Sequence, residues 1–111
     1  PMHLAEHALA VANESGGKIT VKFYNRSKLE KMGAGAFLAV AQGSDNEPVL
    51  IEMSYEPAGA DPHTLLALIG KSVTFDSGGY DMKPSSGMRT MKCDMSGGAA
   101  TVSAIGAIAA L

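Results

Sequence analysis

The sequence predicts an α/β fold in which helices flank a mixed or parallel sheet. Segments with the apolar spacing of helices alternate along the chain with segments typical of strands, and this alternation characterises the class. The run Leu65–Ile69 is apolar at every position, as in a strand that is buried on both faces. Residues 96–111 are small and apolar almost throughout, which predicts a helix buried nearly all round. The 111 residues contain no repeat, low-complexity tract or linker, so they form one domain at most.

The first two elements follow from the spacing of apolar residues. Leu4, Ala8 and Val11 recur at helical intervals, so residues 1–14 are predicted to form a helix. A glycine pair directly afterwards ends it. Residues 18–24 then alternate polar and apolar side chains, which predicts a half-buried strand.

The middle of the chain is less regular. Ser27 and Glu30 match the S-x-x-E capping box and predict a short helix through Met32. The glycine-broken stretch 33–43 is ambiguous between a further helical turn and a loop or strand. Val49–Tyr55 predicts a strand, and residues 56–63 form a loop containing Pro and Gly. Residues 73–75 are candidates to continue the apolar strand of Leu65–Ile69, and residues 76–91 are rich in Gly, Ser and polar side chains and predict a loop.

Composition excludes several classes of function. The net charge is −2 without a basic stripe, which argues against nucleic acid as a partner. No apolar run approaches the roughly 20 residues that a membrane span needs. Residues 1–9 include two His and one Glu where a signal peptide needs an apolar core. The single cysteine, Cys93, fits a reducing compartment, so we expect a cytoplasmic location.

Both ends of the chain lack the signals that frame a helix. No capping residue precedes Pro1 at the first helix. The last helix stops at Leu111 without the Gly, Pro or basic residue that usually marks a helix end. A helix that is apolar on all sides also needs partners on several faces. We therefore expect residues 1–111 to be an internal piece of a larger domain.

Four ionisable residues follow the ends of apolar segments: Lys71, Asp76, Lys83 and Asp94. Ligands of open α/β sheets bind at the carboxyl ends of strands. Carboxylate oxygens suit divalent metals such as Mn, Mg or Zn, whereas a lysine binds a metal only as the neutral amine, with a strongly lowered pKa. The plainer interpretation is that these are solvated or salt-bridged loop residues, and that Asp94 caps the helix after it.

Three other motifs do not hold. Gly70-Lys71-Ser72 matches the end of the phosphate-binding motif G-x-x-x-x-G-K-[ST], but the first glycine is replaced by Leu65 within an apolar run. His3 and His7 share a helical face, yet the intervening glutamate is misplaced for H-E-x-x-H. Cys93 is a candidate nucleophile with His3, His7 or His63 as its base, but nothing local supports this, so Cys93 is expected to be a small filler residue and His63 a solvated turn residue.

The same segment resembles the leucyl aminopeptidase family, which comprises cytosolic peptidases that carry two metal ions. The matching motifs are, in order, Gly70-Lys71, Thr74-Phe75-Asp76-Ser77-Gly78-Gly79, Lys83-Pro84, and Met91-Lys92-Cys93-Asp94-Met95 through Gly98-Ala99-Ala100. Residues 32–44 and 48–51 also match the family, so the resemblance covers nearly the whole chain. A signal this long and ordered is far more specific than a single short motif.

The resemblance implies a role for each site residue. Lys71 matches the lysine metal ligand, Asp76 the carboxylate that bridges both metals, and Asp94 a further ligand that also helps to hold the substrate's free amino group. Lys83 matches the lysine that polarises the scissile carbonyl, and Met91 lines the pocket for the first side chain. The implied reaction removes the N-terminal residue of a peptide with the help of two divalent metal ions, Mn or Zn, with Mg as a third candidate. The implied assembly is a homo-hexamer in the cytoplasm.

The chain also departs from the family. Ser72 replaces the glycine that usually follows the metal-binding lysine, and the later N-T-D-A-E-G-R stretch, which supplies an Asp and a Glu ligand and an Arg, is absent. The family's N-terminal domain is absent as well.

We therefore expect residues 1–111 to be the first part of a catalytic domain, truncated at both ends relative to the family. The parent is expected to be a metal-dependent aminopeptidase, and the chain alone to be inactive with weak metal binding at most. The alternatives are a non-catalytic binding or assembly module and a truncated product without a function of its own.

Overall fold

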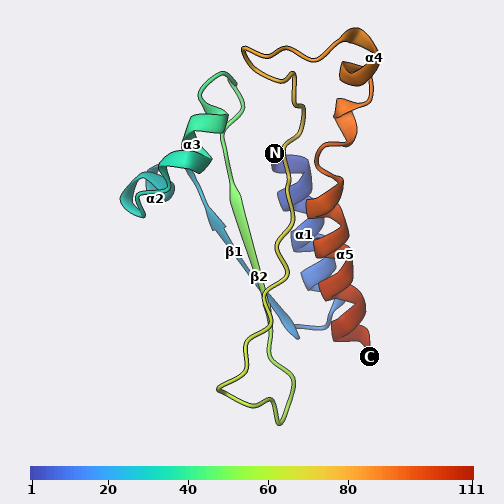
Figure 1. The fold of residues 1–111 in the computed structure, drawn as a ribbon. Coiled ribbons are helices and arrows are strands. Elements are labelled where there is room, and N and C mark those ends of the chain that lie inside the picture. Colours follow the sequence, from blue (N-terminus) through green and yellow to red (C-terminus); the bar gives the residue numbers. More distant parts are fainter.

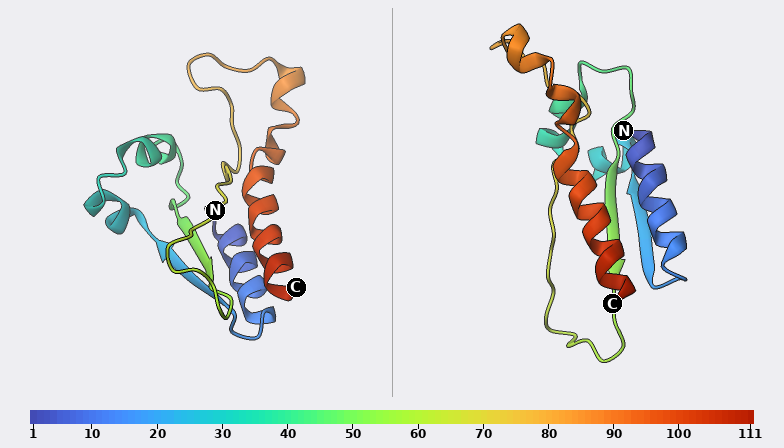
Figure 2. Two further views of the ribbon diagram at one scale, coloured as in Figure 1. Left: turned by 60° about the horizontal axis from the view of Figure 1, so that its bottom comes forward. Right: turned by 90° about the vertical axis from the view of Figure 1, so that its right-hand side faces the viewer.

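Two helices pack side by side against one face of a two-stranded antiparallel ribbon (Figures 1 and 2). The computed structural model describes residues 1–111. Its elements are α1 (Met2–Glu14), β1 (Ile19–Tyr24), α2 (Arg26–Lys31), α3 (Gly35–Ala41), β2 (Leu50–Tyr55), α4 (Ser85–Met88), the 3-10 turn η1 (Met91–Cys93) and α5 (Ser96–Ala110). The α/β class is confirmed. The sheet of these residues is one antiparallel pair, whereas a mixed or parallel sheet was predicted, because the apolar run expected to supply a further strand pairs with no other segment.

Small side chains bring α1 and α5 close to the ribbon. In the ribbon, Ile19 lies opposite Tyr55 and Tyr24 opposite Leu50. The centre of the core is Ala12, Ile19 and Ala109, one residue each from α1, β1 and α5. Five half-buried apolar residues surround it: Val11, Val21, Met53, Tyr55 and Ile105. The predicted helix over 1–14 and the predicted strands over 18–24 and 49–55 are therefore present, with ends shifted by one residue.

Helix α2 begins at a different residue from the one predicted. Asn25, in extended backbone, accepts a hydrogen bond from the Lys28 N–H at 3.1 Å and caps the helix. The predicted capping box at Ser27 is wrong, because that residue already lies inside the first turn. Gly33, with φ +70°, ends α2 in the left-handed region, and the ambiguous stretch after it forms α3.

The apolar run Leu65–Ile69 is not a strand. It pairs with no other segment, and Leu65 and Ile69 are 93% and 92% exposed. Residues 73–75 do not continue it as a strand either. Hydrophobicity predicts that a segment prefers burial, but a strand also needs a neighbour to complete its hydrogen bonds, and these 111 residues supply none at this position.

Helix α5 is only partly enclosed. Of its residues, Gly98, Val102 and Ala109 are buried, whereas Ile108 is 41% exposed, so the prediction of burial nearly all round is wrong for this chain. The predicted loop over 76–91 contains the short helix α4 and the first residue of η1. None of the helices is long and apolar enough to cross a lipid bilayer.

Candidate metal centre

The four predicted site residues lie between residues 71 and 94, in the stretch of chain that leads up to α5. Lys71 follows the apolar run, Asp76 and Lys83 belong to the loop after it, and Asp94 stands two residues before α5. Inside the loop, the Lys83 N–H donates to the Ser77 carbonyl at 2.9 Å, which closes a tight turn. Figure 1 shows this loop folding back at the end of the molecule where α4 lies.

A glycine allows that turn. Gly78 has φ +95°, and a Cβ there would overlap the Asp81 carbonyl and come within 2.9 Å of the Lys83 nitrogen. The Gly78 N–H donates to Asp76 Oδ1 at 2.9 Å. The turn therefore fixes the Asp76 carboxylate from the backbone side and brings Lys83 over it.

The structure brings all four charged side chains together. Lys83 Nζ donates to Asp76 Oδ2 at 2.7 Å. Lys71 Nζ lies 2.8 Å from Asp94 Oδ2 and 3.8 Å from Asp76 Oδ2. Lys71 therefore lies between the two carboxylates, and Lys83 contacts one of them.

These contacts set the protonation states in the chain. The hydrogen bond from Lys83, helped by the Gly78 N–H, holds the pKa of Asp76 below its ordinary value. Contact with the Asp94 carboxylate raises the pKa of Lys71, more than its partial burial lowers it. A lysine ligand needs the opposite shift, so Lys71 is an ammonium here and acts as the counter-ion of Asp94.

Asp94 is the most deeply placed of the four. Its side chain is 16% exposed, and the buried Oδ2 atom accepts no hydrogen bond of good geometry, although the Lys71 ammonium is within ion-pair distance. The Lys71 ammonium thus compensates the charge of this buried oxygen, and a divalent cation would have to take its place. Two carboxylates and an amine fit part of a divalent metal site, and residues 1–111 contain no group of three or more His, Cys, Asp and Glu that would complete one.

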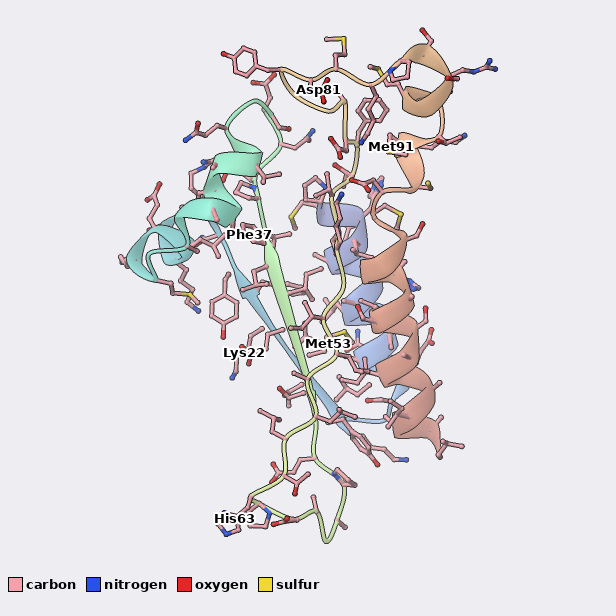
Figure 3. All side chains as sticks on the ribbon, viewed as in Figure 1. Lys22, Phe37, Met53, His63, Asp81 and Met91 are labelled. Carbon is pink, nitrogen blue, oxygen red and sulfur yellow. The ribbon has the colours of Figure 1, made fainter.

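The remaining candidates lie around or away from this cluster. Met91 is half-buried at the start of η1, and its carbonyl accepts the Asp94 N–H at 3.2 Å. Cys93 is an exposed free thiol. Figure 3 shows His63 at the opposite end of the molecule from Asp81 and Met91, so it takes no part in the cluster.

Sequence reasoning missed one feature of the site. The Gly98 N–H donates to the Lys71 carbonyl at 2.7 Å, so the backbone of α5 touches the backbone that carries the site lysine. The glycine pair Gly97-Gly98 at the start of a helix was the available signal, because paired glycines often mark close backbone approach.

Comparisons with known proteins agree with the motifs. The model of the cytosol aminopeptidase family, catalytic domain, matches residues 1–111. A probable cytosol aminopeptidase of Koribacter versatilis is 47% identical over 111 residues, which are all of this chain and 21% of that protein. A probable cytosol aminopeptidase of Nostoc punctiforme is 49% identical over 110 residues, 98% of this chain and 22% of that protein.

The chain thus spans about a fifth of the length of the curated relatives it matches. The matched range, residues 1–111, includes every motif that carries the resemblance. On this basis the chain belongs to the cytosol aminopeptidase family of enzymes, within the catalytic domain.

Proposed function

We propose that this chain is part of a metal-dependent aminopeptidase that removes N-terminal residues from peptides. The observation that carries the proposal is the convergence of Lys71, Asp76, Lys83 and Asp94, in which each contact between a lysine and a carboxylate is 3.8 Å or less. The names of the relatives, probable cytosol aminopeptidases, support the same activity.

Three of these residues have the chemistry to hold a metal ion. Asp76 and Asp94 offer carboxylate oxygens, and the Asp94 Oδ2 atom already contacts a cation, the Lys71 ammonium at 2.8 Å. Lys71 offers an amine once it has lost its proton. A bound divalent ion supplies Lewis-acid activation of water and of the peptide carbonyl.

The other residues act on the substrate. Lys83 holds a fixed positive charge, 29% exposed, where negative charge develops on the carbonyl oxygen, and a preorganised charge in a partly dry site stabilises that oxyanion. Asp94 also attracts the protonated amino group of the peptide. Met91, half-buried three residues earlier, lines the pocket for the first side chain.

Residues 1–111 form the first part of the catalytic domain in this proposal, and the remaining ligands come from residues outside them. The complete site holds two metal ions, Mn or Zn, with Mg as a further candidate, and the complete enzyme is a cytoplasmic homo-hexamer. The chain alone is inactive because two carboxylates are too few for two metal ions.

A chimera tests the activity. Residues 1–111 replace the matching fifth of the Koribacter versatilis relative, and hydrolysis of a leucyl anilide is measured with added Mn²⁺. We expect the chimera to be active and Asp76→Asn to abolish the activity. Asp81→Asn is the matched control, since Asp81 is an exposed carboxylate of the same loop without an ion-pair partner. An inactive chimera that folds, or an active Asp76→Asn variant, would refute the proposal.

The second candidate is a non-catalytic binding or assembly module, and the incomplete donor set is the observation that favours it. A folded chimera that assembles normally but hydrolyses nothing would support this candidate. A truncated product without any function predicts that the chimera neither folds nor assembles.

A further inference from the structure

The segment that carries Lys71 crosses the first turn of α5 at unusually close range. We call this contact the crossing point: residues 70–72 on one side, and Gly97, Gly98 and Thr101 on the other. A Cβ on Gly97 would lie 3.2 Å from the Lys71 nitrogen and 3.3 Å from the Lys71 oxygen. A Cβ on Gly70 would lie 2.5 Å from Thr101 Oγ1 and 2.7 Å from the Gly98 Cα. The two backbones therefore approach each other more closely than side chains allow.

One hydrogen bond fixes the crossing point. The first amides of a helix have no partner within the helix, and no side chain caps α5. The Gly98 N–H instead donates to the Lys71 carbonyl at 2.7 Å. The residue that carries the site amine thus caps, with its own carbonyl, the helix that follows Asp94.

Gly98 is the residue with least room for a side chain. A methyl group on it would overlap Ser72 Oγ and lie 2.9 Å from Ser72 Cβ, whereas the Lys71 oxygen would remain at 3.3 Å. The obstacle is therefore almost entirely the Ser72 side chain. Rotation about the Ser72 Cα–Cβ bond can move the hydroxyl group aside, but the contact with Ser72 Cβ at 2.9 Å remains. Only a shift of the Ser72 backbone relieves that contact, and because Ser72 is bonded to Lys71, such a shift also moves Lys71.

We infer that Gly98 is a positioning residue for the metal centre: through the crossing point it sets where the Lys71 amine stands relative to the Asp94 carboxylate. The present separation, 2.8 Å from Lys71 Nζ to Asp94 Oδ2, depends on the place where the two backbones cross. Gly98 itself contacts neither substrate nor metal in this inference, which rests on the proposed metal-dependent function. Supporting groups of this kind typically change metal affinity by about 10- to 100-fold when altered.

The test uses the 111-residue chain and four variants, with Mn²⁺ as the probe. Gly98→Ala should bind Mn²⁺ about 10- to 100-fold more weakly than the already weak wild type, so that calorimetric titration no longer detects saturable binding. Ser72→Gly should bind with nearly wild-type affinity, and Gly98→Ala combined with Ser72→Gly should recover it, because the double variant removes the overlap. Alanine is also the better helix former, so the added methyl group has no other reason to disturb α5.

Gly106→Ala is the matched control. A Cβ there would lie 2.6 Å from Val11 Cγ1, so it disturbs α5 against α1, far along the helix from the crossing point. We expect Gly106→Ala to lower thermal stability and leave Mn²⁺ affinity unchanged. If Gly106→Ala weakens Mn²⁺ binding as much as Gly98→Ala, or if the double variant binds no better than Gly98→Ala, the inference is wrong.

A metal-free measurement separates this inference from the proposed function. Hydrogen exchange at the amide of residue 98 should be slow in the wild type, fast in Gly98→Ala and slow again in the double variant. Equal protection in wild type and Gly98→Ala would overturn the inference even if metal binds. Absence of Mn²⁺ binding to the wild type, with the expected exchange pattern, would instead count against the metal site and leave the positioning role supported.

Discussion

Replacing Leu29 and Leu65 by alanine, one at a time, tests most directly which of these side chains is buried. Leu29 lies in α2 and is the largest fully buried side chain of the chain, whereas Leu65 is 93% exposed in the unpaired run before the site. The sequence predicts burial for Leu65, and the structure places it in water. The two substitutions to alanine remove the same atoms from opposite environments.

The structure gives the expected magnitudes. Replacing a buried leucine by alanine costs about 2–5 kcal/mol of the free energy of unfolding, from lost transfer energy and the cavity left behind. Replacing an exposed one changes it by about 0.5 kcal/mol or less. Only 9 of the 111 residues are buried, so total stability should lie near the lower end of the usual range, about 5 kcal/mol. Leu29→Ala should therefore remove a large part of it, and Leu65→Ala almost none.

Urea unfolding followed by far-ultraviolet circular dichroism measures both variants against the wild type. The midpoint should fall strongly for Leu29→Ala and stay in place for Leu65→Ala, with similar slopes for all three proteins. A loss at Leu65 as large as the loss at Leu29 would show that the apolar run is packed in solution, and the unpaired geometry of the segment leading to Lys71 would then be wrong.

Three further predictions concern the site, the start of α2 and the ribbon. In calorimetric titration of the chain with Mn²⁺ or Zn²⁺, weak saturable binding should disappear in Asp76→Ala and persist in Asp81→Ala; persistence in both would rule out the cluster as the binding site. By circular dichroism and urea unfolding, Asn25→Ala should cost about 0.5–2 kcal/mol as a lost helix cap, whereas Ser27→Ala should change stability by no more than about 0.5 kcal/mol. On the ribbon, hydrogen bonds from the Tyr24 hydroxyl and the Lys22 ammonium lower the pKa of Glu52 below its ordinary value of 4.5. The ionised Glu52 should therefore stabilise the fold above pH 4.5, and this stabilisation should be lost as the pH falls through the lowered folded-state pKa. Thermal unfolding of Glu52→Gln should consequently lie below wild type at pH 7 and approach it in acid; a gap that stays constant with pH would contradict this assignment.

The sequence predicted best those elements whose signal is local. The helix α1 and the strands β1 and β2 each carry their own periodicity, and that periodicity is sufficient because they pack on one another. The start of α2 was placed wrongly, because Asn25 and Ser27 are both good caps, and only the extended backbone that leaves β1 selects Asn25.

Features that depend on contacts between distant segments could not be predicted from the sequence. The composition of Leu65–Ile69 indicates burial but does not name the partner, and the chain provides none. Motif order identified Lys71, Asp76, Lys83 and Asp94 as a set. It did not reveal which lysine contacts which carboxylate, because that pairing depends on the turn at Gly78 and on the crossing with α5.

The charges of the cluster explain why these residues alone should hold a metal ion only weakly. The cluster contains two ammonium groups, on Lys71 and Lys83, and two carboxylates, so its formal charge is zero. A divalent cation gains little from a neutral group of ligands, and it must also displace Lys71 from Asp94 while the same contact raises the pKa of that lysine. Additional carboxylates would change both conditions at once, since they attract the cation and outnumber the ammonium groups. We therefore expect Lys71, Asp76, Lys83 and Asp94 by themselves to bind a divalent metal ion weakly.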